Sequence, residues 1–191
     1  MGREFELKVR AEIAVIQQIR EKYGDFTPIS METTYYDTFD LKLSMHHWTL
    51  RRRMENGVSV CTFKRPHENG GRGEWEVEAP NITEGLMQLC KAGADWELMR
   101  CASGGLMEVC GARFTRLAKQ LEVPGAIVEL ALDQGVLIGK GKEVAFAEVE
   151  VELKEGTDEA AVAFAKVLAE EFGLIPEAKS KFVRAMTLAM T

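Results

Sequence analysis

Charged and apolar side chains alternate along several short segments of the chain, at the spacing expected of β-strands. Residues 4–8 read Glu-Phe-Glu-Leu-Lys, and residues 148–153 read Glu-Val-Glu-Val-Glu-Leu. Successive side chains of a strand point to opposite faces, so each segment has one ionic face and one apolar face. Residues 51–53, 62–64 and 74–78 add basic and acidic positions of the same kind. These strands need a common place for their charges.

Two arrangements can accommodate the ionic faces. In the first, each face meets solvent, as on many antiparallel sheets. In the second, the strands close into a barrel with a polar lumen, and acidic strands face basic ones across the interior. Three glutamates in alternate positions of residues 148–152 repel one another, and only a lumen brings opposite charges or divalent cations close to them. The set of strands therefore favours a charged lumen.

The segment Glu4-x-Glu6-x-Lys8 is the first of a series of blocks that runs along almost the whole chain. The other blocks are Tyr35-Tyr36-Asp37-Thr38, Leu50-Arg51-Arg52-Arg53, Thr62-Phe63-Lys64, Glu74-Trp75-Glu76, Glu129-Leu130-Ala131-Leu132-Asp133, Glu148-x-Glu150-x-Glu152 and Ser180-Lys181-Phe182-Val183-Arg184. In content and order they resemble the CYTH superfamily, also called triphosphate tunnel metalloenzymes, and most of all its bacterial inorganic triphosphatase branch. The resemblance implies an α+β fold, a closed antiparallel eight-stranded β-barrel with a charged lumen and flanking helices.

A triphosphate site needs hard cations as well as basic side chains. Mg²⁺ and Mn²⁺ prefer carboxylate oxygens and rarely require a full cage of protein ligands. Two strands of the expected barrel can supply such oxygens to one or two ions. The expected metal ligands are Glu4, Glu6, Glu148, Glu150 and Glu152.

Basic side chains would hold the phosphates. Arginine suits bidentate contacts with phosphate oxygens, whereas lysine offers a point charge. Lys181 and Arg184 are one helical turn apart, so both can point the same way and close one end of the lumen. Arg116 is added by the resemblance, because it matches the family's later basic strand. The expected substrate-binding residues are Lys8, Arg51, Arg53, Lys64, Arg116, Lys181 and Arg184.

Catalysis would use a metal ion that polarises a phosphoryl group and stabilises the charge developing on the leaving diphosphate. The expected catalytic residues are Glu6, Lys8 and Lys181. Either a carboxylate or Lys181 can orient the attacking water, and the sequence does not choose between them.

The periodicity predicts the elements that must position these residues. We expect strands over about 3–10, 27–37, 48–55, 58–65, 74–79, 112–122, 126–133 and 143–154, with an Asn56-Gly57 hairpin turn. We expect helices after the first strand, over 158–172 and from about 179, and helical structure outside the barrel within 83–111. Glu129 and Asp133 match the lumen face, although residues 133–135 can alternatively form a turn.

Composition is consistent with one globular domain over residues 1–191, since 46% of the residues are hydrophobic. The chain has no apolar run long enough to cross a bilayer and no signal-peptide pattern, so we expect a cytoplasmic protein without a membrane partner. A net charge of −6 disfavours nucleic acid as a partner, and the four cysteines are expected to be free thiols. A monomer and a homodimer are both compatible with the sequence.

The expected activity is hydrolysis of tripolyphosphate to phosphate and diphosphate with Mg²⁺ or Mn²⁺. A class IV adenylate cyclase and a thiamine or nucleoside triphosphatase are alternatives that would use the same lumen. A non-catalytic polyphosphate-binding protein is an alternative of a different class. The intact set of acidic positions argues against it, because anion binding alone does not need so many carboxylates.

Overall fold

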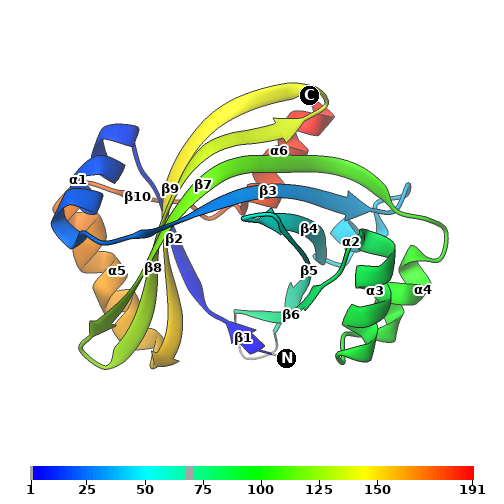
Figure 1. Cartoon of the computed structure of the whole chain (residues 1–191), viewed down its shortest axis with the longest axis horizontal. Helices are drawn as coiled ribbons and strands as arrows, with labels where there is room; N and C mark the ends of the chain where they lie inside the picture. The colour runs from blue at the N-terminus through cyan, green and yellow to red at the C-terminus, as the bar shows by residue number, and fades with distance from the viewer. Residues whose placement is uncertain (1, 68–70) are drawn as a thin grey trace.

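The computed structural model describes residues 2–67 and 71–191 (Figure 1). In chain order the elements are β1 (Gly2–Glu4), β2 (Glu6–Arg10), α1 (Ile13–Tyr23), β3 (Thr27–Asp37), α2 (Lys42–Met45), β4 (Thr49–Glu55), β5 (Val58–Pro66), β6 (Arg72–Glu78), α3 (Ile82–Lys91), α4 (Trp96–Ala102), β7 (Met107–Val123), β8 (Ala126–Gly139), β9 (Lys142–Gly156), α5 (Asp158–Phe172), β10 (Ile175–Pro176) and α6 (Lys181–Met190). The fold is α+β.

The strands form a single antiparallel sheet in the order β1-β6-β5-β4-β3-β7-β8-β9-β2-β10. The long strands β3, β7, β8 and β9 curve into an arch, with α1 and α5 at one end of the molecule and α3 and α4 at the other (Figure 1). The closed eight-stranded barrel predicted from the sequence is not confirmed, because the hydrogen-bonded order is open, with β1 at one end and β10 at the other.

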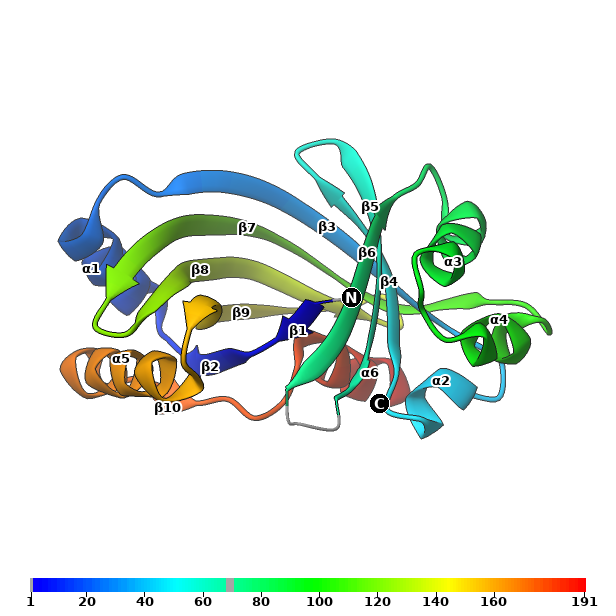
Figure 2. The same cartoon turned by 90° about the horizontal axis from the view of Figure 1, so that it is seen from below.

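One segment at the start of the chain serves both halves of this open sheet. β1 pairs with β6, whereas β2, which begins two residues after the end of β1, pairs with β9. Phe5 lies between the two strands, and its carbonyl accepts a hydrogen bond from the Leu153 N–H at 2.9 Å. Figure 2 shows β1 beside β6 and β2 beside β9. The predicted first strand is therefore divided at Phe5, because its two parts have different partners.

Two details of the strands differ from the sequence-based expectations. The alternative turn at residues 133–135 is wrong, because β8 continues through them to Gly139 while paired on both sides. Residues 107–111 belong to β7 rather than to a helix, since they extend its pairing with β3 as far as Asp37. The Asn56-Gly57 turn is confirmed, and both of its residues have positive φ, as this type of hairpin requires.

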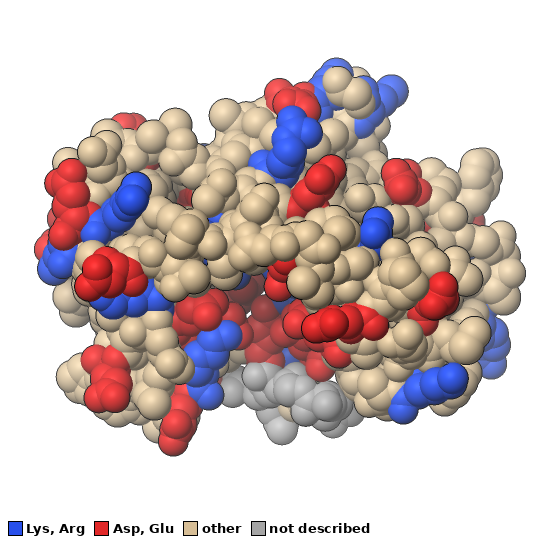
Figure 3. Space-filling model, viewed as in Figure 1, with Lys and Arg blue, Asp and Glu red and all other residues tan. Residues whose placement is uncertain are grey.

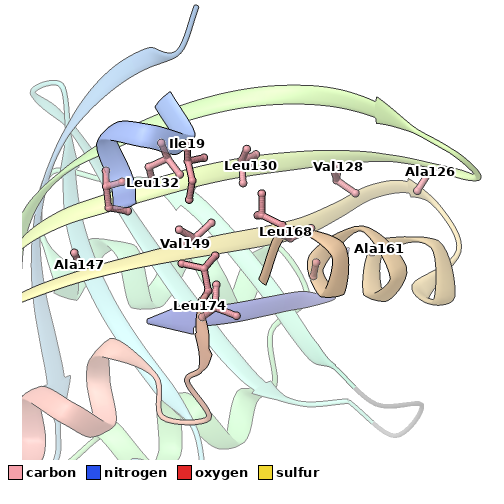
Figure 4. Close-up of a cluster of buried hydrophobic side chains, with 14 residues drawn as sticks. Ile19, Ala126, Val128, Leu130, Leu132, Ala147, Val149, Ala161, Leu168 and Leu174 are labelled. Carbon is pink, nitrogen blue, oxygen red and sulfur yellow. The ribbon is translucent and has the colours of Figure 1, made fainter. Parts of the chain in front are cut away.

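The outer face of β8, β9 and β2 carries the largest apolar cluster (Figure 4). Leu130 and Val149 point away from the charged face of their strands and pack against Ile19 of α1 and Leu168 of α5. Thr157 caps the first turn of α5 by accepting a hydrogen bond from Ala160 N, and Gly173 ends the helix with φ of 63°. The alternation that exposes carboxylates on one face therefore builds a hydrophobic core on the other.

The outer face of β4, β5 and β6 is covered in the same way by α3 and α4. Phe63 and Trp75 of the sheet belong to one cluster with Leu89 and Leu98 of the helices. The expectation of helices outside the sheet within residues 83–111 is thereby confirmed for α3 and α4. No helix in the described ranges is long and apolar enough to cross a membrane.

The last helix, α6, packs on the opposite, inner face. Phe114 is two residues from Arg116 on β7, so both side chains lie on the same face, and Phe114 clusters with Phe146 and Ala185 of α6. Gly139 permits this packing, because a Cβ atom at this position would lie 2.6 Å from Ala185 O. The inner face is thus apolar where α6 covers it and charged farther along the strands.

We predict that Leu168→Ala destabilises the protein by about 2–5 kcal/mol, because the side chain is 1% exposed and its loss leaves a cavity between α5 and the sheet. Val167→Ala is the matched control, since Val167 lies on the same helix and is 61% exposed. Urea denaturation of both variants measures the free energy of unfolding. Equal losses in the two variants would contradict the packing described here.

Candidate functional site

The charged inner face lines a cavity of about 980 Å³. Asp and Glu residues (red) gather around a hollow in the middle of the molecular face, with Lys and Arg residues (blue) beside them (Figure 3). Among the described residues, the lining contains eight cations and eight carboxylates: Lys8, Arg51, Arg53, Lys64, Arg72, Arg116, Lys154, Lys181, Glu4, Glu6, Glu55, Glu74, Glu76, Glu129, Glu150 and Glu152. Its formal charge is therefore balanced before any anion enters.

The basic side of the cavity is built mainly on β4, β5 and β6. Arg51 and Arg53 alternate along β4, and Arg51 is opposite Thr62 of β5 in the register. Arg51 Nη2 lies 3.9 Å from Glu74 Oε1, and Lys64 Nζ lies 3.3 Å from the same oxygen. Lys64 also contacts Glu4. The predicted basic positions of two strands thus lie on one wall of the cavity.

The guanidinium groups on this wall retain unused donors. The Nε atoms of Arg51, Arg53 and Arg72 are buried and have no hydrogen-bond partner among the described residues. Burial, together with the charges of Arg51 and Arg116, lowers the pKa of Arg53 to about 10. Buried donors on closely spaced cations are costly unless an anion satisfies them. The wall has the chemistry of a receptor for phosphate oxygens.

Carboxylates occupy the facing strands in a row. Glu129 of β8 is opposite Glu152 of β9, which is opposite Glu6 of β2. Glu152 Oε1 accepts from Lys154 Nζ at 2.8 Å. Burial raises the pKa of Glu152, the interaction with Lys154 opposes this effect, and the charges of Glu129 and Glu4 add to it. The three carboxylates of the row contact two lysines, Lys8 and Lys154, so their negative charge is only partly compensated locally.

A separate group of carboxylates lies deeper and is fully paired. Asp133, Glu148 and Glu150 offer oxygens within 4.8 Å of one another, a spacing compatible with a metal ion. The ammonium of Lys181 lies among them, 2.6 Å from Asp133 Oδ2 and 2.8 Å from Glu150 Oε1, and it also contacts Glu148. Arg116 donates from Nε and Nη2 to the two oxygens of Asp133 at 2.8 and 2.7 Å, and it contacts Glu150.

These contacts favour the charged forms of Lys181 and Glu150. Burial would lower the pKa of Lys181, but the charges of Asp133, Glu150 and Glu148 raise it above the ordinary lysine value. Burial likewise opposes ionisation of Glu150, yet Lys181 and Arg116 hold its pKa well below the usual range. Lys181 is therefore a fixed positive charge.

The structure brings most of the predicted site residues to one cavity. The predicted residues that line it are Glu4, Glu6, Lys8, Arg51, Arg53, Lys64, Arg116, Glu150, Glu152 and Lys181. Glu148 and Arg184 are not among the described lining residues, because Glu148 is fully buried and contacts Arg184 as well as Lys181. Lys181 and Arg184 point the same way, as their spacing predicts, but Arg184 lies behind the wall.

Sequence reasoning missed two cations of the lining, Arg72 and Lys154. The alternation contained the signal for both. Arg72 continues the pattern of Glu74 and Glu76 by one step, and Lys154 does the same after Glu152. Arg72 Nη2 donates to Thr49 Oγ1 at 3.1 Å and to the His47 carbonyl at 3.4 Å, which are neutral acceptors.

Comparison with protein families decides the relationship that these motifs suggested. The CYTH domain family matches residues 2–186. The chain belongs to the CYTH family. One curated relative of this CYTH protein is the inorganic triphosphatase of Haemophilus influenzae, to which it is 25% identical over 195 residues. The match covers 98% of this chain and 55% of the relative, so the chain spans about half the length of that protein.

Solved structures resemble this CYTH protein over almost their full length. A protein of Pyrococcus horikoshii OT3 is 25% identical, with a TM-score of 0.66 and coverage of 96% of this chain and 98% of its own. A protein from Hippeastrum, described as a candidate adenylyl cyclase with a dominant triphosphatase activity, has a TM-score of 0.68 at 19% identity, and the match covers 97% of this chain and 96% of its own. The latter likeness shows the fold.

We predict that Lys181→Met lowers the free energy of unfolding by about 3–5 kcal/mol, because it leaves three buried carboxylates without their shared cation. Lys179→Met is the control, since the side chain of Lys179 is exposed on the segment just before α6. Thermal and urea denaturation measure the loss. A Lys181→Met variant as stable as the control would show that the cluster does not need this cation.

Proposed function

We propose that this protein is a metal-dependent hydrolase that cleaves inorganic triphosphate to phosphate and diphosphate in the charged cavity. The observation that carries the proposal is that the buried Nε atoms of Arg51, Arg53 and Arg72 have no hydrogen-bond partner among the described residues, in a cavity that is also lined by a row of carboxylates. The activity of the Haemophilus influenzae relative and of the Hippeastrum protein supports the same reaction class.

Two members of the carboxylate row, together with Glu4 beside it, fit a divalent cation. Glu4 Oε2 is buried and accepts no hydrogen bond from the described residues, so this oxygen is available to bind a metal ion. Glu4, Glu6 and Glu152 would hold Mg²⁺ or Mn²⁺, with Glu150 beside them and its oxygens partly engaged by Lys181 and Arg116. When bound, such an ion supplies Lewis-acid polarisation of a phosphoryl oxygen and neutralises negative charge. The balanced charge of the lining makes an accompanying cation necessary for a polyanion.

The basic side chains would bind and orient the substrate. Arg51, Arg53 and Arg72 can donate in pairs to phosphate oxygens, and Lys8 and Lys64 add point charges. Arg116 is held in a fixed orientation by Asp133, so it presents a preorganised charge to the cavity. Positioning and charge stabilisation account for most catalysis of phosphoryl transfer.

The attacking water is better oriented by a carboxylate than by Lys181. Lys181 contacts three carboxylates, which occupy its three N–H donors, and its raised pKa keeps it protonated. Glu6 is half-buried at the cavity, and Lys8 Nζ lies 3.5 Å from its Oε1. We assign the orientation of water to Glu6 and a purely electrostatic role to Lys181.

The direct test is a product analysis with tripolyphosphate, ATP and thiamine triphosphate, each with Mg²⁺, with Mn²⁺ and with EDTA. We expect equal amounts of phosphate and diphosphate from tripolyphosphate, slower turnover of the organic triphosphates, and no turnover in EDTA. Cyclic AMP and diphosphate from ATP would instead identify a cyclase. Tight triphosphate binding without turnover would identify a binding protein.

We predict that Glu6→Gln lowers kcat for tripolyphosphate at least about hundredfold, because the variant loses a metal-binding oxygen and the group that orients water. Glu21→Gln on the exposed face of α1 makes the same chemical change away from the cavity and serves as the control. Circular dichroism verifies that both variants are folded. Full activity of a folded Glu6→Gln variant would contradict the assignment.

Arg72→Ala is expected to raise KM for tripolyphosphate about tenfold or more, because it removes a charged donor from the phosphate-binding wall. Arg20→Ala, at an exposed position of α1, is the control. Steady-state kinetics separates KM from kcat in the two variants. An unchanged KM would place Arg72 outside the substrate contacts.

A further inference from the structure

A lysine at an irregularity in the sheet lies beside two carboxylates of the cavity. In the register of β8 and β9, Val128 pairs with Leu153 and Ile127 pairs with Glu155, so Lys154 is an extra residue without a partner in this part of β8. Such a bulge bends the strand, and bulges are frequent beside active sites. Lys154 lines the cavity together with Glu129 and Glu152.

The ammonium of Lys154 bridges two strands. Its Nζ lies 2.8 Å from Glu152 Oε1 and 3.9 Å from Glu129 Oε2. These glutamates are direct cross-strand neighbours, so without a cation their like charges would repel. The side chain of Lys154 is 36% exposed. Its ammonium can therefore move toward solvent on the flexible four-carbon stem.

We propose that Lys154 is a tethered counter-ion of Glu129 and Glu152, which a divalent cation must displace before it binds Glu152. The position of Lys154 then sets the affinity of the site for the ion. The inference rests on the proposed function in one respect, since both require a cation at Glu152.

Lys181 provides the contrast that supports this role. The side chain of Lys181 is 9% exposed and is enclosed by three carboxylates, so its removal would deprive a buried group of its shared cation. Lys154 contacts two partly exposed carboxylates, and one of these contacts is near the limit of an ion pair. A divalent cation can compete with the ammonium of Lys154 for these carboxylates, because the displaced ammonium can be hydrated by solvent. The ion pairs of Lys181 are therefore permanent, whereas the ammonium of Lys154 can be displaced from its carboxylates.

The test measures Mn²⁺ binding to the metal-free full-length protein by isothermal titration calorimetry, without substrate. The proteins compared are wild type, Lys154→Gln, Lys154→Arg and Lys142→Gln. We expect the Kd of Lys154→Gln to fall about tenfold, because a positive charge no longer competes for the carboxylates. Lys154→Arg retains the charge and should stay close to wild type. Lys142 is exposed at the beginning of the same strand, so Lys142→Gln controls for the change in net charge.

Thermal unfolding supplies a second readout. In EDTA, Lys154→Gln should have a lower Tm than wild type, because the two glutamates lose their counter-ion. Added Mn²⁺ should raise its Tm by more than it raises that of wild type, since tighter binding to the folded state stabilises it further. A lysine with a purely structural role would lower the Tm in EDTA without increasing the response to Mn²⁺.

The outcomes separate this inference from the proposed function. Wild-type protein that binds Mn²⁺, with Lys154→Gln binding it equally or more weakly, would overturn the inference and leave the proposed function intact. No Mn²⁺ binding by either protein would overturn both the inference and the metal requirement of the proposed reaction. Tighter binding by Lys142→Gln as well would trace the effect to net charge and also overturn the role of Lys154.

Discussion

The inner face of the sheet must hold carboxylates close together, and the structure depends on how their charge is compensated. Lys181 contacts Asp133, Glu148 and Glu150 at once, and Arg116 holds Asp133 from the other side. These contacts tie β7, β8 and β9 to α6 through one network. A buried network of this kind is stable only when every member has its partners. The position of α6 inside the arch is therefore an electrostatic requirement as well as a packing one.

Two groups of carboxylates with different freedom follow from this arrangement. The deep group has its oxygens engaged by three cations, Lys181, Arg116 and Arg184, and lies in a fixed geometry. The shallower row of Glu129, Glu152 and Glu6 has fewer and more exposed partners, and Glu4 Oε2 beside it has none among the described residues. The first group can orient Arg116 toward a substrate, whereas the second can exchange its counter-ions. Carboxylates thus have a structural role where they are deeply buried and a ligand-binding role where they lie nearer the solvent.

The sequence predicted much of this arrangement because the alternation of side chains is a local property. It assigned Glu6, Glu150 and Arg51 to a common interior, and all three line the cavity. It did not predict the open order of the sheet, because the division of the first strand at Phe5 depends on which distant strands pair with each half. Glu148 matched the alternation and Arg184 matched the helical spacing to Lys181, yet both lie behind the wall, since depth along an inner face is set by the packing of α6. Lys154 continues the alternation one step beyond Glu152, but its contact with Glu129 depends on the register of β8 and β9, which alternation alone does not reveal.

The order of these elements along the chain has a consequence for synthesis on the ribosome. Lys181 follows Glu150 by 31 residues, and it comes after all the strands that carry the deep carboxylates. At about 5–20 residues per second, Glu150 is made roughly 2–6 s before Lys181. A nascent sheet that closed its inner face during this interval would bury three carboxylates against the single positive charge of Arg116. The emerging strands must therefore keep this face hydrated until α6 arrives, which makes docking of the last helix the step that seals the interior.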